Sequence, residues 1–528
     1  MIESFADFQI HFLWVIIVGA CLAFLLGFGM GANDVSNAFG TSVGSKVLSL
    51  KAAYILATIF ETLGAVLVGY NVTDTMRKGI VDIEIYKNDT DQLLVGQLAI
   101  LGGGSTWLIL ATIFKLPVST THSVVGATLG FTLLAKGLEG IQWKKVAQIA
   151  ASWVVSPLLS GLVSSIMYIV VDFVVLRKKD PITAGMRALP FIYFLCLAFN
   201  TFVITNQGSK ILHLNDIPLW LSLLISLTIG IASALIFHFV ARPRLLKWIE
   251  QGRVGDQETN QKRASVTIVG ENKLDENGTQ LPVKMYETVP PVIKQKFEPT
   301  PKGFIKWLFP ARKRQIDSKT YRLFSAIQVF TACFAGFAHG ANDVSNAIGP
   351  LSAMYSIYKE NDPMQKNATP IFILLYGVLA TCVGLWILGH RVIKTVGQKM
   401  SEINPASGFT IEFGAAVTAL LASKAGLPIS TTHCLVGSVV AVGTVKSGEG
   451  VDWRIFRNIA LSWVVTLPVS GGISALIMLF LKWDCIIVCS AKTFNIVDTG
   501  LNILEHLFIS ALFIHNIHLE CNFIKYLT

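Results

Sequence analysis

The chain contains one ten-residue string almost unchanged in two places, Gly31-Ala-Asn-Asp-Val-Ser-Asn-Ala-Phe-Gly40 and Gly340-Ala-Asn-Asp-Val-Ser-Asn-Ala-Ile-Gly349. A second pair of strings follows, Leu116-Pro-Val-Ser-Thr-Thr-His122 and Leu427-Pro-Ile-Ser-Thr-Thr-His433. Each string lies in or beside an apolar segment. Burying an unsatisfied polar group in hydrocarbon costs about 2 to 7 kcal/mol. Matched polar strings at membrane depth therefore predict a binding site.

The composition is that of an integral membrane protein. Hydrophobic residues make up 52% of the 528 residues and charged residues 14%, with a mean hydropathy of +0.58. Soluble domains carry about 25% charged residues. Apolar runs long enough to span a bilayer, about 20 residues, occur at 12–30, 50–70, 93–113, 147–175, 188–206, 217–241, 322–340, 369–389, 408–426 and 455–481. We expect an all-α polytopic protein with ten to twelve transmembrane helices, in which the shorter runs 116–135 and 427–446 are broken spans or re-entrant hairpins.

The two halves of the chain are internal repeats. Besides the strings, Trp143 and Trp153 in the first half correspond to Trp453 and Trp463 in the second, with an offset of about 310 residues throughout. An odd number of predicted crossings separates the copies, so the second copy is inverted in the membrane. Inverted repeats with interrupted helices are typical of secondary transporters, which bind substrate near the bilayer midplane where the halves meet.

The net charge of +10 is concentrated in one segment that lacks apolar periodicity. The positive-inside rule explains this basic segment better than binding to nucleic acid does. We therefore expect a first transmembrane repeat (1–175), two connecting transmembrane helices (176–241), a basic and largely disordered cytoplasmic loop (242–321), a second, inverted repeat (322–483) and a divergent carboxyl-terminal tail (484–528). Counting crossings then puts the amino terminus outside, where Asn88-Asp-Thr90 is the better of two external glycosylation sequons.

The first pair of strings has the chemistry of a cation site. Asn33, Asp34, Asn342 and Asp343 lie beside glycines that permit local unwinding. Unwound carbonyls, carboxylates and amide oxygens suit a small alkali cation. The alternative is that both aspartates cap helices, but capping alone does not require the same string in both halves.

The second pair of strings suits an oxyanion. Proline favours the first turn of a helix, so Ser119, Thr120 and Thr121, and likewise Ser430, Thr431 and Thr432, would combine hydroxyls with free backbone N–H groups at a helix N-terminus. The alternative is a cap rich in serine and threonine. For the histidines that follow, His122 and His433, a core role and a proton-sensitive role stay open.

Two further carboxylates lie within apolar runs. We expect Glu61 to bind a cation or couple its movement to that of the anion, and Glu412, in the corresponding region of the second half but out of strict register, to share that role. The strings contain no lysine or arginine. A bound cation would therefore have to neutralise the anion.

With these strings, the chain resembles the PiT family of sodium-dependent inorganic phosphate transporters (solute carrier family 20). The resemblance covers about residues 10–483 and includes Phe60-Glu-Thr-Leu-Gly64 and Arg187-Ala-Leu-Pro190. It implies sodium-coupled phosphate uptake at the plasma membrane and an external glycan at Asn88. It also implies that Asn33, Asp34, Asn342 and Asp343 contribute to Na+ binding and that Ser119, Thr120, Thr121, Ser430, Thr431 and Thr432 contact phosphate. Thr120 and Thr431 replace a glycine found in many animal members, and the resemblance stops near Trp483.

The resulting prediction is a sodium/phosphate symporter that works by alternating access and has no enzymatic activity. Its expected partners are phosphate, sodium and the lipid bilayer, with no organic cofactor and no nucleic acid, and a homodimer is compatible with it. The alternatives are a proton-coupled carrier of another tetrahedral anion, such as sulfate, and a phosphate sensor or cell-surface receptor that does not transport.

Overall fold

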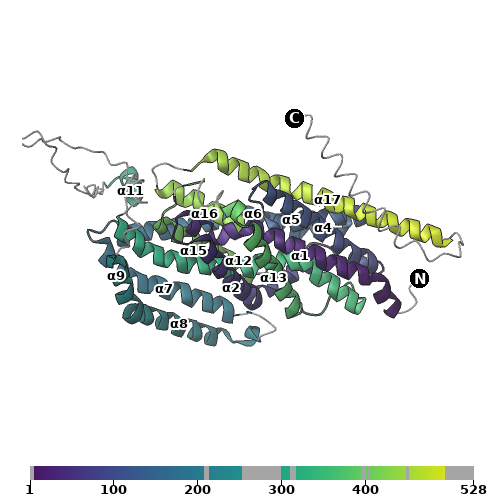
Figure 1. Cartoon of the computed structure of the whole chain (residues 1–528), viewed down its shortest axis with the longest axis horizontal. Coiled ribbons are helices and arrows are strands. Elements are labelled where there is room, and N and C mark those ends of the chain that lie inside the picture. The colour runs from purple at the N-terminus through teal and green to yellow at the C-terminus, as the bar shows by residue number, and fades with distance from the viewer. Residues whose placement is uncertain are drawn as a thin grey trace, which may run out of the picture. The chain divides into compact units, whose positions relative to one another are not determined.

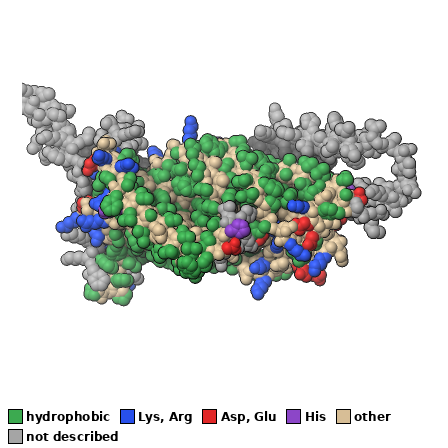
Figure 2. Space-filling view, turned by 90° about the horizontal axis from the view of Figure 1, so that it is seen from below, with side chains coloured by type: hydrophobic (Ala, Val, Ile, Leu, Met, Phe, Trp, Pro, Cys, Tyr) green, Lys and Arg blue, Asp and Glu red, His purple; other side chains and the backbone are tan. Residues whose placement is uncertain are grey.

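The computed structural model describes residues 5–206, 208, 213–251, 299–309, 317–393, 400–401, 403–446 and 451–493. Every long element in these ranges is a helix, and ten of the helices are long and apolar enough to cross a membrane. This confirms the prediction of an all-α polytopic membrane protein. On the face shown in Figure 2, hydrophobic side chains cover most of the surface and charged side chains gather toward its two ends.

The helices of the described ranges fall into two series joined by a connecting group (Figure 1), and apart from α3 the two series have the same order. The first series is α1 (Phe5–Gly44), α2 (Leu50–Val68), α3 (Tyr70–Lys78), α4 (Thr90–Ile113), α5 (Thr120–Lys136) and α6 (Trp143–Val171). The connecting group is α7 (Pro181–Thr205), α8 (Leu219–Ile236), α9 (Arg242–Gln251) and α11 (Pro301–Leu308). The second series is α12 (Ser318–Glu360), α13 (Ile371–Leu388), α15 (Pro405–Lys424), α16 (Thr431–Lys446) and α17 (Trp453–Thr493).

Both ten-residue strings lie inside uninterrupted helices, α1 and α12. The expected unwinding at their glycines does not occur. Instead, the glycines allow two backbones to touch. A Cβ atom on Gly31 would lie 1.9 Å from the carbonyl oxygen of Thr381, and one on Gly340 would lie 2.1 Å from that of Glu61. Helix α1 therefore packs directly against α13, and α12 against α2, at the level of the aspartates.

The chain is interrupted at the second pair of strings instead. Helices α4 and α5 form an antiparallel pair whose open ends are joined, because Asp82 N–H donates to Gly140 O and Gln142 N–H donates to Ile80 O, both at 3.0 Å. The tip between them, residues 114–119, turns through Lys115, which has a φ of 60°. The two helices therefore form a hairpin, the arrangement expected of a re-entrant hairpin rather than of a broken span at residues 116–135.

The second half has the matching hairpin, formed by α15 and α16. Its open ends are joined by Asp452 N–H, which donates to Met400 O at 3.0 Å. The turn at its tip uses Gly426, with a φ of 66°. Because this φ favours glycine, the tip of the second hairpin has the residue that its backbone prefers, whereas Lys115 adopts the same backbone region in the first tip.

The ends of the predicted cytoplasmic loop are helical where they are described, in α9 and α11. An arginine donates a hydrogen bond to a carbonyl group in the last turn of each of these two helices. One arginine lies in α12 and the other in the turn that follows α6. Arg322 donates to Ile249 O at 3.1 Å, and Arg177 donates to Trp307 O at 2.7 Å. Residues 252–298 lie outside the described residues.

Residues 1–478 form one compact unit, and residues 479–528 form a second one. The described part of the second unit continues helix α17 as far as Thr493. The tail predicted at 484–528 therefore begins as helix, and its apolar run at 501–515 lies outside the described residues.

Candidate functional site

The tips of the two hairpins meet, and each tip is tied to the other by a threonine that the sequence assigned to phosphate. Thr121 Oγ1 donates to Ile429 O at 2.9 Å, and Thr432 Oγ1 donates to Val118 O at 3.3 Å. These bonds connect residues 308 and 314 positions apart in the chain. The N-termini of α5 and α16, the second helix of each hairpin, therefore face one another. We call α5 and α16 the half-helices.

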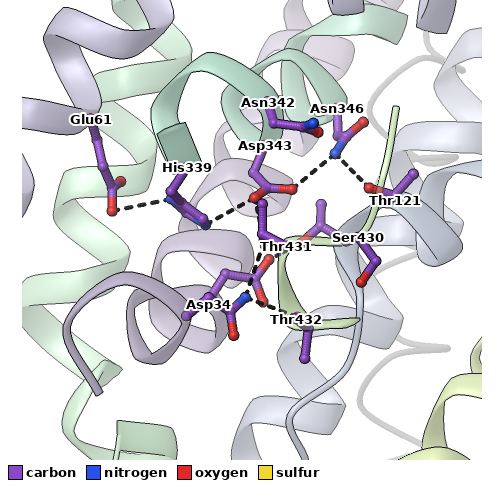
Figure 3. A network of polar contacts seen from close by, with 12 residues as sticks. Asp34, Glu61, Thr121, His339, Asn342, Asp343, Asn346, Ser430, Thr431 and Thr432 are labelled. Atoms are coloured by element: carbon purple, nitrogen blue, oxygen red, sulfur yellow. Dashed lines mark hydrogen bonds and ion pairs between the residues drawn. The ribbon is translucent and has the colours of Figure 1, made fainter. Parts of the chain in front are cut away.

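The threonines one position earlier contact the aspartates of the other pair of strings. Thr120 Oγ1 donates to Asp34 Oδ2 at 2.5 Å, and Thr431 Oγ1 donates to Asp343 Oδ2 at 2.6 Å. The predicted anion site and the predicted cation site are thus in direct contact in both halves, as Figure 3 shows for the second half. These four side chains are all buried.

Two asparagines that the sequence analysis did not select complete this network. Asn37 Nδ2 donates to Thr432 Oγ1 at 2.8 Å. Asn346 Nδ2 donates to Thr121 Oγ1 at 2.9 Å (Figure 3). Each asparagine therefore reaches the hairpin of the opposite half. Both stand three residues after the aspartate in the repeated string. That spacing puts them on the same helix face as the aspartate and was the available signal.

Four side-chain oxygens in this network are buried and accept no hydrogen bond from any residue that the structure describes. They are Asp34 Oδ1, Asn37 Oδ1, Asn342 Oδ1 and Asn346 Oδ1. A buried polar atom without a partner costs about 1 to 3 kcal/mol unless something fills its place. Carboxylate and amide oxygens without donors are the ligands that a hard cation prefers.

Asn33 is placed differently from Asn342. Its amide donates to Thr112 Oγ1 at 3.1 Å and to Leu116 O at 2.9 Å, and its oxygen accepts from Val118 N–H at 3.1 Å. Asn342 donates to Ser423 Oγ at 3.2 Å and keeps its oxygen free. Asn33 therefore holds the tip of the first hairpin through Leu116 and Val118. It is linked to the network by these contacts and leaves no free oxygen of its own.

Ser119 and Ser430 act as helix N-caps. Ser119 Oγ accepts from His122 N–H at 3.3 Å, and Ser430 Oγ accepts from His433 N–H at 3.2 Å. Capping uses the hydroxyl oxygen as acceptor and leaves the hydroxyl proton available to an anion. The capping alternative and the anion-binding interpretation are therefore compatible.

His339, which the sequence analysis missed, joins Glu61 to Asp343. Its Nδ1 lies 3.2 Å from Glu61 Oε1, and its Nε2 lies 3.2 Å from Asp343 Oδ2 (Figure 3). Ligand atoms of Asp34, His339 and Asp343 also lie within 4.8 Å of one another, so the aspartates of both halves converge. The available signal was the position of His339 one helical turn before Asp343.

Within the described residues, this connection between α2 and α12 has no equivalent between α13 and α1. Gly340 contacts the backbone of Glu61 in α2, and the equivalent Gly31 contacts that of Thr381 in α13, so Thr381 takes the place of Glu61 in the other half. Met30 takes the place of His339. Glu412 belongs to α15, the counterpart of α4, so the expectation that it corresponds to Glu61 is corrected.

Glu412 lies in a cage of donors at another level of the same helices. Thr41 and Ser42 of α1 donate to it at 2.5 and 2.6 Å, and Gln328 and Thr331 of α12 donate at 3.3 and 2.6 Å. Glu412 is fully buried. Glu412 therefore connects the second hairpin to α1 and α12. The threonines of the hairpin tips are not among these four donors.

A small cavity lies beside the network in the second half. Asn37, His339 and Thr431 line it together with five alanines: Ala335, Ala338, Ala415, Ala416 and Ala419. At the offset of the repeat, Leu26, Met30 and Leu108 stand in the first half where Ala335, His339 and Ala419 stand here.

The remaining predicted residues lie around this centre. His122 and His433 are buried and directly follow Thr121 and Thr432 in the chain, with their ring centroids 4.6 Å apart. Asn88 lies in an exposed turn before α4.

Comparisons with known proteins bear on this arrangement. A family model described as "Phosphate transporter family" matches residues 30–474. The chain is 34% identical to "Sodium-dependent phosphate transporter 1" of Rattus norvegicus, covering 89% of this chain and 95% of the relative. It is 34% identical to "Sodium-dependent phosphate transporter 2" of Xenopus tropicalis, covering 90% and 99%. A solved structure described as "The sodium-dependent phosphate transporter" is similar with a TM-score of 0.71 and 31% identity, covering 89% of this chain and 99% of that chain.

Proposed function

Because the chain belongs to the phosphate transporter family, we propose that it imports inorganic phosphate together with sodium ions by alternating access. The observation that carries the proposal is the direct contact between the paired threonines of the hairpin tips and the paired aspartates of α1 and α12. Such a contact puts an anion site and a cation site side by side in a buried place. The family is one of transporters rather than enzymes, and ten helices long and apolar enough to cross a membrane agree with a multi-pass protein.

Phosphate would bind between the two hairpin tips. The helix N-termini at Ser119 and Ser430 offer backbone N–H groups and positive dipole ends, and the threonines that follow offer hydroxyls. Thr120 and Thr431 each donate to an aspartate. They would therefore tie the position of the anion to that of the cation.

Sodium would bind to the free oxygens of Asp34, Asn342 and the added ligands Asn37 and Asn346, with Asp343 shared between His339 and the ion. Asn33 would contribute by fixing the hairpin tip. Because the strings contain no lysine or arginine, phosphate brings uncompensated negative charge into a medium of low dielectric constant. A sodium ion beside Asp34 would offset that charge, which couples the two ions.

Glu61 would participate in coupling through His339, and Glu412 by connecting the second hairpin to α1 and α12. Alternating access would exchange equivalent contacts between the two series of helices. Six helices long enough to span precede the basic segment, and one of them, α4, belongs to the first hairpin, which leaves the five helices α1, α2, α6, α7 and α8. Since each hairpin returns to its starting side, this odd number agrees with an external amino terminus, a cytoplasmic basic loop and a glycan at Asn88 at the plasma membrane.

The test is uptake of radiolabelled phosphate by the purified full-length chain in proteoliposomes, with an inward sodium gradient or with choline. We expect uptake only with sodium, inhibition by arsenate and little inhibition by sulfate. Asp34→Asn and Asp343→Asn should each lower uptake about 100-fold or more, because loss of one buried charge partner costs about 3 to 5 kcal/mol. Asp180→Asn, at an exposed helix cap where asparagine serves equally well, is the matched control.

Each alternative gives a different result in this assay. Uptake driven by a proton gradient in choline, or competition by sulfate, would indicate the carrier of another kind. Phosphate binding without accumulation, unaffected by Asp34→Asn, would indicate a sensor or receptor and would contradict the proposal.

A further inference from the structure

Four aromatic rings lie in a row next to Thr121 and Thr432, which, with Thr120 and Thr431, we call the binding threonines because they would bind phosphate in the proposed function. Trp153 of α6 stacks on His122 of α5 with centroids 3.9 Å apart, His122 meets His433 of α16 at 4.6 Å, and His433 meets Trp463 of α17 at 3.7 Å. We call these four residues the ring stack. Each tryptophan contacts the histidine of its own half, and the two histidines meet where the halves join.

The ring stack is fixed to the N-termini of both half-helices. Each histidine follows a binding threonine in the sequence, and its own backbone N–H is bonded to the capping serine, Ser119 or Ser430. A shift of either imidazole therefore requires a shift of the first helical turn that carries the hydroxyls. The distance between the rings and the distance between the two anion-binding turns are linked.

Glycine contacts hold the rest of each half-helix against the other half. A Cβ atom on Gly126 of α5 would lie 2.6 Å from Leu467 O of α17, and one on Gly437 of α16 would lie 2.3 Å from Pro157 O of α6. Each half-helix thus packs on the long helix of the opposite half, while its histidine stacks on the tryptophan of its own half. The ring stack is the place where all four helices are joined.

The hydrogen bonds of the rings favour a geometric role over proton transfer. His433 Nδ1 lies 3.0 Å from Trp153 O, which again crosses between the halves. Within the described ranges, His122 Nδ1 and His433 Nε2 are buried and have no hydrogen-bond partner, so neither faces a carboxylate that could exchange a proton with it.

We propose that the ring stack is a spacer that sets the separation of the two half-helix N-termini, and that His122 and His433 are positioning residues for phosphate. The inference rests on the proposed function. A tetrahedral anion held by hydroxyls from both turns requires one particular separation, and a misplacement of about 1 Å weakens such a site strongly. Van der Waals contact between flat rings fixes a separation without adding charge.

The test compares two variants of one residue, His122→Ala and His122→Phe, in sodium-driven phosphate uptake by the full-length chain. We expect His122→Ala to raise the KM for phosphate about 10-fold with a smaller change in kcat, as expected for loss of an aromatic contact. His122→Phe should restore a KM near that of the unchanged protein, since it keeps a ring and the buried Nδ1 of His122 has no hydrogen bond to lose. The pH profile of uptake should be the same for His122→Phe and the unchanged protein.

A double variant tests whether the rings act together. Because His122 and His433 belong to one stack, His122→Ala combined with His433→Ala should raise KM by less than the product of the single effects. Trp143→Leu and Trp453→Leu are matched controls, because these tryptophans are the other equivalent pair, are 52% and 60% exposed, and lie outside the stack. Both should leave KM unchanged.

An unchanged KM in His122→Ala, failure of phenylalanine to restore it, or a pH profile altered by phenylalanine would each overturn the proposal. If the alanine variant does not fold, Trp463→Leu removes an outer ring instead, and an unchanged KM there overturns the proposal equally. Absence of sodium-driven uptake in the unchanged protein would contradict the proposed function itself and is thereby distinguished from failure of this inference.

Discussion

Replacing Gly31 by alanine should separate α1 from α13 and abolish transport. The added Cβ atom would lie 1.9 Å from the carbonyl oxygen of Thr381, whereas ordinary contacts begin at 3.4 Å. The two backbones must therefore move apart by about 1.5 Å, since neither can yield as a flexible side chain would. Asp34 lies three residues further along the same helix face and must move with its backbone.

The expected cost has two parts. Overpacking between two helices lowers stability by about 1 to 3 kcal/mol. Displacement of Asp34 stretches its bond to Thr120, which is 2.5 Å long, and a misplacement of about 1 Å in such a site can lower the rate about 100-fold. The equivalent change Gly340→Ala should act in the same way through the backbone of Glu61.

The assay is the initial rate of sodium-driven phosphate uptake per reconstituted molecule, together with the apparent melting temperature in detergent. Gly472→Ala is the matched control, because nothing lies within 4 Å of a Cβ atom there and alanine is favoured by about 0.5 to 1 kcal/mol in a helix. It should retain uptake. Normal uptake by Gly31→Ala would refute the reasoning that backbone contact at the string positions the aspartate.

Three further predictions concern other parts of the molecule. Glu412→Leu should lower stability by about 3 kcal/mol because it leaves buried donors without an acceptor, whereas Glu412→Gln should cost about 1 kcal/mol; denaturation in detergent measures both, and equal effects would argue against the donor cage. Asn33→Ala should release the first hairpin tip and raise proteolysis between α4 and α5 several-fold over that in Asn342→Ala, because Asn33 bonds to Leu116 and Val118 in that tip and Asn342 does not. Asn88→Gln should remove a glycosidase-sensitive shift on gels of protein made in glycosylating cells, and persistence of the shift would place the glycan elsewhere.

The sequence was sufficient for the helical class and for most of the centre. Repetition of the strings singled out Asp34, Asp343 and the threonines, which the structure brings into contact. The sequence could not decide between a broken span and a re-entrant hairpin, because that depends on backbone contacts such as the one between Asp82 and Gly140, which no local pattern reports.

The parts that sequence reasoning missed depend on partners far away in the chain. Gly31 was taken as a point of unwinding, but its neighbour 350 positions later makes it a point of close contact. His339 gains its role from Glu61, on a different helix. Glu412 was aligned with Glu61 because both are isolated carboxylates in apolar runs, whereas their helices have different counterparts in the repeat.

The central claim is that a cation at the aspartates offsets the negative charge of an oxyanion, because the strings that form the pocket contain no lysine or arginine. Its most direct test is the Kd of phosphate for the purified protein, measured by calorimetry with saturating sodium and with choline. We expect sodium to tighten phosphate binding at least about 10-fold, with phosphate tightening sodium binding by the same factor, as linkage requires. A phosphate Kd that is the same in sodium and in choline would contradict the account.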